Sequence, residues 1–262
     1  MEKEKILGHF AGELERLTAA QVLDRIVAAG ATGKPLATDF LDPCQQRTAD
    51  MVVSFCKGFK QVTWGGYAGA ERARVLVFPA EKQQTAADVP VAFIKAVPAA
   101  AAAALSHRNY LGALLGLGLR REKIGDILVA ADGSAQIILV PEIKEFVLAN
   151  LQAAGKYRLR TAEIFAEDLV LPEARTREIK TTVASLRLDA VASAGFGISR
   201  SKLAPAIKAG HVKLNWQTAK NASVPVKAGD VISVAGRGRV EVAEIQGESR
   251  KGRLRLVLKK HY

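Results

Sequence analysis

The last third of the chain combines a large excess of positive charge with the apolar alternation of β-strands. Residues 183–262 hold 15 Lys and Arg against 5 Asp and Glu, whereas residues 1–182 hold 23 against 21. Val, Ile and Leu recur at every second position in the runs DVISVAG, RVEVAEIQ and RLRLVLKK, which predicts strands with one buried face. Because such faces need a core of their own, residues 183–262 are expected to fold as a separate basic domain.

The charge of the whole chain points to an anionic partner. The formal net charge is +12 and 49% of the residues are hydrophobic, so a packed basic protein is expected, and nucleic acid is the usual partner of such a protein. The first ten residues, MEKEKILGHF, lack the apolar run of a secretory signal. The most apolar window, residues 89–105, contains Lys95 and two prolines, which makes it unsuitable as a membrane span. A protein without a membrane segment is expected, located in the cytoplasm or in the matching compartment of an organelle or cyanobacterium.

No pattern in the sequence indicates a metal, a cofactor or a catalytic centre. Cys44 and Cys56 have no His or Cys cluster around them, which predicts two reduced structural thiols and no zinc. The four histidines lie far apart in the sequence and accompany no nucleophile motif; they are His9, His107, His211 and His261. We therefore expect neither catalytic residues nor bound cofactors.

Residues 1–70 are predicted to form a helical N-terminal region. A first helix is predicted from four apolar residues at helical spacing, Ile6, Phe10, Leu14 and Leu17. A second helix is predicted to begin with Thr18 as its cap and to stop at Gly30, and a third is predicted over residues 42–57.

Residues 71–165 alternate strand and helix patterns in the order β-α-β-β-α-β. The runs ARVLVFP and VPVAFIKAV predict strands, Ser106 begins a helix, Asp132-Gly133 turns a hairpin, and a helix from Pro141 to Gly155 precedes a last strand. This order predicts a ferredoxin-like, RRM-like sandwich. Since Phe93 is expected in the core, RNA contacts of this domain would rest on Arg108, Arg120, Arg121 and Lys123, with a solvated helix end as the equal alternative. Residues 166–182, with Pro172 near the middle, read as a connector.

The C-terminal domain, residues 183–262, contains two short predicted helices and a turn at residues 227–230. Leu188, Val191 and Ala192 share a face of the first helix. The second is predicted within ISRSKLAPAIKAG, with Ser199 or Ser201 as its cap, Gly210 at its end and an awkward Pro205 inside. A capped helix N-terminus offers free N–H groups to a phosphate. Arg200 and Lys202 add charge at that point, and the track could continue over Arg187, Lys208, Lys213 and Lys220.

Several motifs of this domain resemble a known family. The runs R-L-D, S-R-S-K, I-K-A-G-H-V-K-L-N and K-A-G-D-V-I-S-V resemble the S-four RNA-binding domain, over about residues 183–245. SHRNYLGALLGLGLRREKIGDILV, Asn215-Trp216 and ISVAGRGR are similar to YlmH-type proteins, over about residues 70–262. One branch of that family carries the label photosystem II S-four domain protein. The resemblance implies an α+β chain with a helical N-terminal part, an RRM-like middle domain and a C-terminal S-four domain.

The resemblance also implies RNA binding, and the lack of catalytic motifs in the sequence favours a non-catalytic protein. The implied targets are ribosomal RNA or tRNA on the large ribosomal subunit, in the quality control of translation. The RNA-facing positions it implies are Arg187, Ser199, Arg200, Ser201, Lys202, Lys208, Lys213 and Asn215. Family members often carry Arg where Ala235 stands here, and Arg237 and Arg239 could compensate.

Alternatives remain open at the level of single residues and of function. Arg187 could pair with Asp189, Asn215 could be a turn residue, Trp216 could belong to the core, and Lys259 and Lys260 could be solvated charge. An RNA-modifying enzyme of the pseudouridine synthase or methyltransferase class is the main alternative function. Arg187-Leu188-Asp189 resembles the pseudouridine synthase motif but opens a helix of the binding domain, which favours a structural Asp189. A protein-interaction module for photosynthetic assembly is a third class, suggested by the family label.

Overall fold

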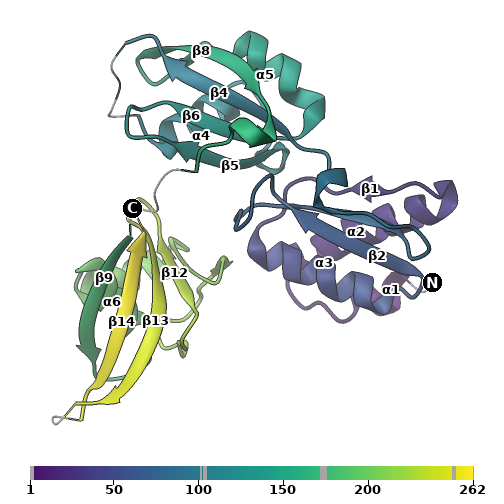
Figure 1. Ribbon diagram of the computed structural model, residues 1–262. Coiled ribbons are helices and arrows are strands. Elements are labelled where there is room, and N and C mark those ends of the chain that lie inside the picture. Colours follow the sequence, from purple (N-terminus) through teal and green to yellow (C-terminus); the bar gives the residue numbers. More distant parts are fainter. Residues whose placement is uncertain (1–2, 101, 103–104, 172–175, 250–251, 262) are drawn as a thin grey trace. The chain divides into compact units, whose positions relative to one another are not determined.

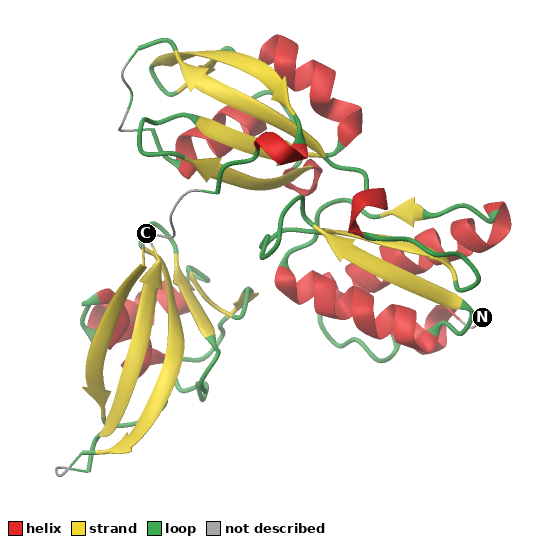
Figure 2. Ribbon diagram, in the orientation of Figure 1, coloured by secondary structure: helices red, strands yellow, loops and turns green. Residues whose placement is uncertain are grey.

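The computed structural model describes residues 3–100, 102, 105–171, 176–249 and 252–261. The chain divides into two compact units, Met1–Pro172 and Glu173–Tyr262 (Figures 1 and 2). Each unit has its own hydrophobic core and mixes α-helices with antiparallel β-sheet, so the α+β class predicted from the sequence is confirmed. Among the described residues, no helix has the length and apolar character needed to cross a membrane.

The described part of the N-terminal half of the first unit consists of three helices and a small three-stranded sheet. Its elements are α1 (Lys3–Leu7), α2 (Glu13–Thr32), β1 (Leu36–Ala37), α3 (Pro43–Phe55), β2 (Phe59–Trp64) and β3 (Arg74–Pro79), and the strand order is β1-β3-β2. Val22 and Ile26 of α2, Val52 of α3 and Val75 and Val77 of β3 are buried in one cluster. Cys44 and Cys56 are both buried in this half, and burial raises the pKa of Cys56.

Two of the predicted N-terminal helix boundaries are wrong. Thr18 does not cap a helix but lies buried inside α2, where its hydroxyl donates to the carbonyl of Leu14 at 2.9 Å. Leu14 itself is 51% exposed, so the spacing that suggested a buried stripe at this point does not mark the core. The helix passes Gly30 and ends at Thr32, and the capping residue Gly33 has a φ of 65°, the left-handed conformation that favours glycine.

The strand run at residues 74–79 belongs to the N-terminal half, whereas the sequence placed it in the middle domain. β3 pairs antiparallel with both β1 and β2. The 1–70 region is therefore not helical alone, because it also contributes β1 and β2 to this sheet.

The second half of the first unit is a five-stranded antiparallel sheet with helices on one face. We call it the middle half, because it lies in the middle of the whole chain. Its elements are η1 (Ala86–Asp88), β4 (Ala92–Pro98), α4 (His107–Gly116), η2 (Arg121–Lys123), β5 (Ile124–Val129), β6 (Ala135–Leu139), η3 (Pro141–Ile143), α5 (Lys144–Asn150), β7 (Ala153–Ala154), β8 (Tyr157–Ile164) and η4 (Ala166–Asp168). The strand order is β5-β6-β4-β8-β7. The predicted β-α-β-β-α-β order is observed from β4 to β8, while the likeness to RRM domains stays a prediction.

Local signals in this half behave largely as predicted. Ser106 precedes α4, and Gly133, at φ 85°, turns the β5–β6 hairpin. Pro141 opens the short η3 turn that leads into α5. Gly155 does not stop that helix, because α5 ends at Asn150 and the short strand β7 intervenes.

The two halves of the first unit are joined through Asp126 of β5. Its carboxylate accepts hydrogen bonds from the hydroxyl of Tyr67 at 2.8 Å and from the backbone N–H of Arg72 at 3.1 Å. The Arg72 guanidinium in turn donates to the carbonyls of Ile124 and Phe40. These hydrogen bonds connect the two halves, because each joins Tyr67 or Arg72 of the N-terminal half to β5, apart from the bond between Arg72 and Phe40.

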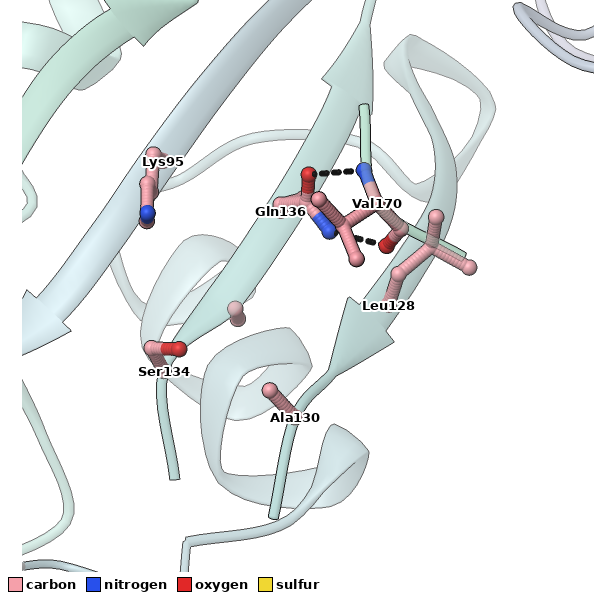
Figure 3. Close-up of a pocket in the computed structure, with 7 residues that line it drawn as sticks. Lys95, Leu128, Ala130, Ser134, Gln136 and Val170 are labelled. Atoms are coloured by element: carbon pink, nitrogen blue, oxygen red, sulfur yellow. Dashed lines mark hydrogen bonds between the residues drawn. The ribbon is translucent and has the colours of Figure 1, made fainter. Parts of the chain in front are cut away.

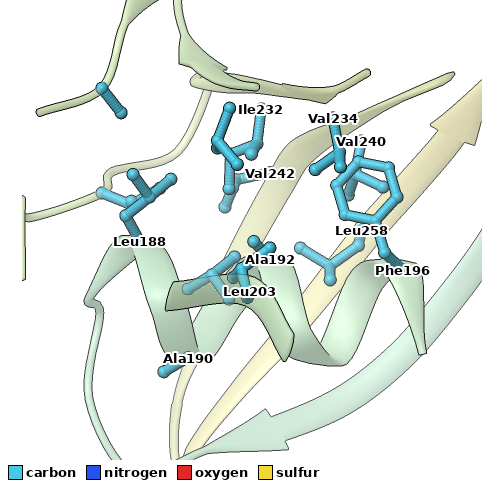
Figure 4. Close-up of a cluster of buried hydrophobic side chains, with 14 of the residues drawn as sticks. Leu188, Ala190, Ala192, Phe196, Leu203, Ile232, Val234, Val240, Val242 and Leu258 are labelled. Atoms are coloured by element: carbon cyan, nitrogen blue, oxygen red, sulfur yellow. The ribbon is translucent and has the colours of Figure 1, made fainter. Parts of the chain in front are cut away.

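The second unit is a six-stranded antiparallel sheet with two helices. Its elements are β9 (Thr176–Val183), α6 (Leu188–Phe196), α7 (Arg200–Lys208), β10 (Val212–Leu214), β11 (Gln217–Thr218), β12 (Val231–Val234), β13 (Gly238–Glu248) and β14 (Leu254–His261), in the order β11-β10-β12-β13-β14-β9. Figure 4 shows the core, where Leu188, Ala192 and Phe196 of α6 and Leu203 of α7 meet Val240 and Leu258 of the sheet.

The connector predicted over residues 166–182 is shorter in the structure. Its last part forms β9, which pairs with β14 over its whole length from Thr176 to Val183. Residues 172–175, which include Pro172, lie outside the described part of the chain.

Candidate nucleic-acid interface

The N-terminus of α7 is built by its cap and anchored by its buried face. Ser199 is the N-cap residue, and its hydroxyl accepts a hydrogen bond from the backbone N–H of Lys202 at 3.4 Å. The Ser199 and Ser201 hydroxyl oxygens lie 2.9 Å apart in a second hydrogen bond. Leu203 and Ile207 fix the helix to the core. The predicted cap and the Pro205 inside the helix are both observed.

Two exposed cations stand at this helix N-terminus. Arg200 is the first helical residue and Lys202 the third, and both side chains are exposed. Within the described ranges, neither side chain takes part in an ion pair. The positive end of the helix dipole and two uncompensated cations therefore share one small surface, which is suited to a phosphate group.

A second group of predicted residues lies on the outer face of the C-terminal sheet. Lys213 pairs with Ser233, and Ser233 pairs with Arg239, so these three residues form a row across β10, β12 and β13. Lys213 follows the buried Val212 and Arg239 precedes the buried Val240. Because side chains alternate along a strand, this row points away from the core and from the helices.

The predicted set is therefore divided into two groups. The α7 group consists of Ser199, Arg200, Ser201 and Lys202, and the sheet group contains Lys213 and Arg239. Arg239 already has an interaction within the protein. Three further cations of the predicted set are exposed but belong to neither group: Lys208 in the last turn of α7, Lys220 after β11 and Arg237 in the β12–β13 turn.

Arg187 pairs with Asp189, which was the alternative raised from the sequence. The guanidinium Nε lies 3.1 Å from Asp189 Oδ1, and Nη2 lies 3.4 Å from Oδ2. Asp189 Oδ1 also accepts the backbone N–H of Ala190 at 2.9 Å, in the first turn of α6. The Asp189 carboxylate thus orders the start of this helix, while the Arg187 side chain remains about half exposed.

Asn215 holds the β10–β11 turn in place. Asn215 and Trp216 have φ angles of 50° and 67°, the left-handed pair required by a two-residue hairpin turn. The Asn215 side chain donates to Asp230 Oδ1 at 2.9 Å and accepts the backbone N–H of Val231 at 2.9 Å. Because both ends of the Asn215 amide are hydrogen-bonded within the domain, the interpretation of Asn215 as a turn residue is favoured. Trp216 is half-buried and has contacts of its own.

Two residues of the secondary set are engaged within the first unit. Arg121 donates to the carbonyls of Ile124 and Gly125, and burial followed by the charge of Arg72 lowers its pKa to about 10, so it remains cationic at neutral pH. The Lys123 ammonium forms an ion pair with Asp39 at 2.7 Å. The ion pair of Lys123 could not be predicted from the sequence, because Asp39 lies 84 positions away.

The other two residues of the secondary set are more accessible. Arg120 forms an exposed ion pair with Glu122 at 3.2 Å, which is worth little energetically. Arg108 is exposed in the first turn of α4. The sequence reading did not single out Lys95 and Arg160, two exposed cations on β4 and β8. Both could have been found from the sequence, because each is a cation next to a buried apolar residue in a strand and therefore lies on the opposite, exposed face.

Comparison with known families covers most of the chain. Residues 186–232 match the S4 domain, which is the S-four domain named above. Residues 86–168 match the family described as "Putative RNA-binding domain in YlmH", and residues 15–82 match "YlmH, N-terminal". These matches define an S-four domain protein in which two further domains precede the basic one.

Two related proteins narrow this class. The chain is 35% identical over 226 residues to "Ribosome-associated protein quality control protein P2" of Bacillus subtilis (strain 168). The matched region covers 85% of this chain and 86% of the relative. The solved structure "Cell division protein ylmH from Streptococcus pneumoniae" shares its fold with 62% of this chain and 97% of its own length, at 22% identity and a TM-score of 0.52. The chain belongs to the YlmH family, as its motifs had indicated.

Proposed function

We propose that this protein is a non-catalytic RNA-binding protein of the cytoplasm that recognises structured RNA through its C-terminal domain. The proposed targets are ribosomal RNA or tRNA on the large ribosomal subunit. The proposed setting is the quality control of translation, in line with the name of the Bacillus subtilis relative.

The observation that carries this proposal is the α7 N-terminus with its two unpaired cations. Ser199 orders the first turn by accepting the N–H of Lys202, and Arg200 and Lys202 place their charges at the positive end of the helix dipole. Contacts of this kind hold phosphates and read the shape of an RNA rather than its bases. The S-four match over residues 186–232 includes this helix.

The enzyme alternative has little support at the residue that suggested it. A catalytic aspartate needs access to its substrate, but the Asp189 side chain is 13% exposed and already bonded to Arg187 and to the N–H of Ala190. Incubation of the purified protein with ribosomal RNA, with and without a methyl donor, tests this alternative. The appearance of a modified base would overturn the non-catalytic assignment.

The variant Arg200→Glu/Lys202→Glu tests the RNA-binding proposal. We expect it to move from the large-subunit fraction to the top of a sucrose gradient, because repulsion replaces phosphate attraction at α7. Arg16→Glu/Lys57→Glu is the matched control, since both residues are exposed in the first unit and the charge change is the same. This control should sediment like the wild-type protein.

Salt dependence gives a second readout of the same variant. Loss of two phosphate contacts should reduce the slope of log K against log salt by about 2 for structured RNA. Wild-type binding that does not respond to salt would contradict the electrostatic account. Sedimentation of the wild-type protein at the top of the gradient would favour free RNA or, as the photosystem II label of one branch suggests, a protein partner.

A further inference from the structure

The sheet of the middle half has one face that its helices leave uncovered. Tyr110 and Leu114 of α4 and Val147 of α5 pack on the opposite face. At one end of the uncovered face, Phe93 of β4 and Ile138 of β6 are buried with Phe40 of the N-terminal half. We call the remainder of this face the open face; it carries Lys95, Val97, Gln136, Arg158 and Arg160.

Strand register places cations on the open face. Lys95 of β4 pairs with Gln136 of β6 and with Ala162 of β8, and Val97 pairs with Arg160. Lys95 and Arg160 are therefore diagonal neighbours on adjacent strands, a relation in which the Cα atoms lie about 7–8 Å apart. Arg158 lies two residues before Arg160 and shares its face. In the described part of the chain, none of these three cations belongs to an ion pair.

The segment after β8 is fastened across the same face. The backbone N–H of Val170 donates to Gln136 Oε1 at 2.8 Å, and Gln136 Nε2 donates to the Val170 carbonyl at 2.5 Å (Figure 3). The side chain of Val170 is nevertheless 71% exposed. An apolar group is thus held in a fixed position at the surface, where it covers no core.

A shallow pocket of about 200 Å³ lies between this segment and the strands. Its apolar lining includes Leu128, Ala130 and Val170, and Lys95 and Ser134 stand at its polar side (Figure 3). Asp132, in the adjacent β5–β6 turn, has its carboxylate occupied by the hydroxyl and N–H of Ser134, at 2.7 and 2.9 Å. The hydrogen bonds from Ser134 and, to a lesser degree, the charge of Lys95 lower the pKa of Asp132, so its ionised carboxylate partly offsets the Lys95 charge. The pocket therefore combines an apolar lining with an exposed, partly compensated cation.

We propose that the open face binds single-stranded RNA, with the base of one unpaired nucleotide in the pocket and neighbouring phosphates on Lys95 and Arg160. An apolar pocket suits the flat face of a base, and cations on adjacent strands suit successive phosphates of a flexible strand. This inference rests on the proposed function and extends it. Structured RNA is bound by α7, and an unpaired stretch is bound by a separate surface in the first unit.

Two variants of the full-length protein test this surface. Lys95→Glu/Arg160→Glu reverses the charges, and Val170→Glu places a carboxylate at the pocket on an already exposed side chain. Arg16→Glu/Lys57→Glu is again the matched control, since it also changes one Arg and one Lys. The probes are a fluorescent uridine oligonucleotide and an RNA hairpin whose stem is fully paired and closed by a short, stable tetraloop, and the readout is fluorescence anisotropy. Circular dichroism checks that each variant is folded.

We expect Lys95→Glu/Arg160→Glu to weaken oligonucleotide binding at least tenfold and to reduce its salt slope by about 1.4, the value for two contacts to a single strand. Val170→Glu should also weaken it, and hairpin binding should change less than twofold in both variants. Crosslinks from a photoreactive uridine should map to β4, β5 and β8.

Several results would overturn the inference. Unchanged oligonucleotide affinity in both variants would do so, as would a wild-type protein that does not bind the oligonucleotide. Binding of an acidic peptide in place of RNA, lost in the same variants, would assign the face to a protein. If Arg200→Glu/Lys202→Glu abolishes hairpin binding in any of these cases, the proposed function stands without the open face.

Discussion

Asn215 shows how one residue can look functional in the sequence and prove structural. Its side chain connects the β10–β11 turn to Asp230, which is 5% exposed and also accepts the N–H of Lys227. Asn215→Ala removes two hydrogen bonds and leaves buried polar groups unsatisfied, so the free energy of unfolding should fall by about 2–4 kcal/mol. Urea unfolding of the full-length protein measures this loss.

Asn221 provides the comparison for that variant. Its side-chain oxygen accepts from the N–H and hydroxyl of Ser223, but the site is exposed, so Asn221→Ala should cost about 0.5–1 kcal/mol. If Asn215 positions the turn without touching RNA, folded Asn215→Ala should bind an RNA hairpin with nearly wild-type affinity. A large loss of affinity at unchanged stability would return Asn215 to the RNA-facing set.

The limits of sequence reasoning at this scale follow from the distance between partners. The pair of Arg187 with Asp189 was foreseeable, because two positions separate them and both begin a helix. The pair of Lys123 with Asp39 was not, because it depends on how two halves of a unit pack. Local rules predicted caps and turns, such as Ser199 and Gly133, whose partners lie within a few residues.

At the scale of elements, one hydrogen bond connects α4 to the β5–β6 hairpin. The hydroxyl of the fully buried Tyr110 donates to the carbonyl of Gly133 at 2.6 Å. Burial, and to a lesser degree the charge of Asp132, raises the pKa of Tyr110 to about 12 from the ordinary value of 10.0. Tyr110→Phe should cost about 1–2 kcal/mol at neutral pH, because the Gly133 carbonyl loses its partner.

The pH dependence of that variant has a definite sign. Because the folded-state pKa is raised, the neutral phenol stabilises the fold fully below pH 10, and this contribution is lost as the pH rises from 10 to 12. The loss should reach about 2–3 kcal/mol. The free energy of unfolding, measured from pH 10 to pH 12, should therefore fall more steeply for the wild type than for Tyr110→Phe. Parallel curves would contradict the raised pKa.

Strand pairing explains most of the remaining differences between prediction and structure. The hairpin at Asp132-Gly133 was predictable because its two strands are adjacent in sequence. β2 was not predicted because Lys60, Gln61 and Thr63 make its sequence polar. None of its positions is fully buried, so it lacks the apolar alternation that marks a strand. β3 was recognised as a strand but assigned to the wrong sheet, since its partners β1 and β2 are identified by packing and not by local pattern.

At the scale of the whole molecule, the division of charge coincides closely with the division into two compact units. The net charge of residues 183–262 is +10 and that of residues 1–182 is +2. The buried residues of the C-terminal cluster all belong to Glu173–Tyr262, so this unit does not depend on the first for its core. We therefore expect residues 173–262, produced alone, to fold and to give a cooperative unfolding transition.

The same division predicts how RNA binding separates between the units. The fragment 173–262 should bind the same tetraloop RNA hairpin within about tenfold of the full-length affinity and with nearly the same salt slope, because the slope counts phosphate contacts made by α7 and its neighbours. The fragment 1–172 should lose hairpin binding but keep affinity for a uridine oligonucleotide through Lys95 and Arg160. Anisotropy titrations at several salt concentrations compare the three proteins. If neither fragment binds the hairpin although both are folded, recognition needs both units together, and α7 is not a sufficient site for structured RNA.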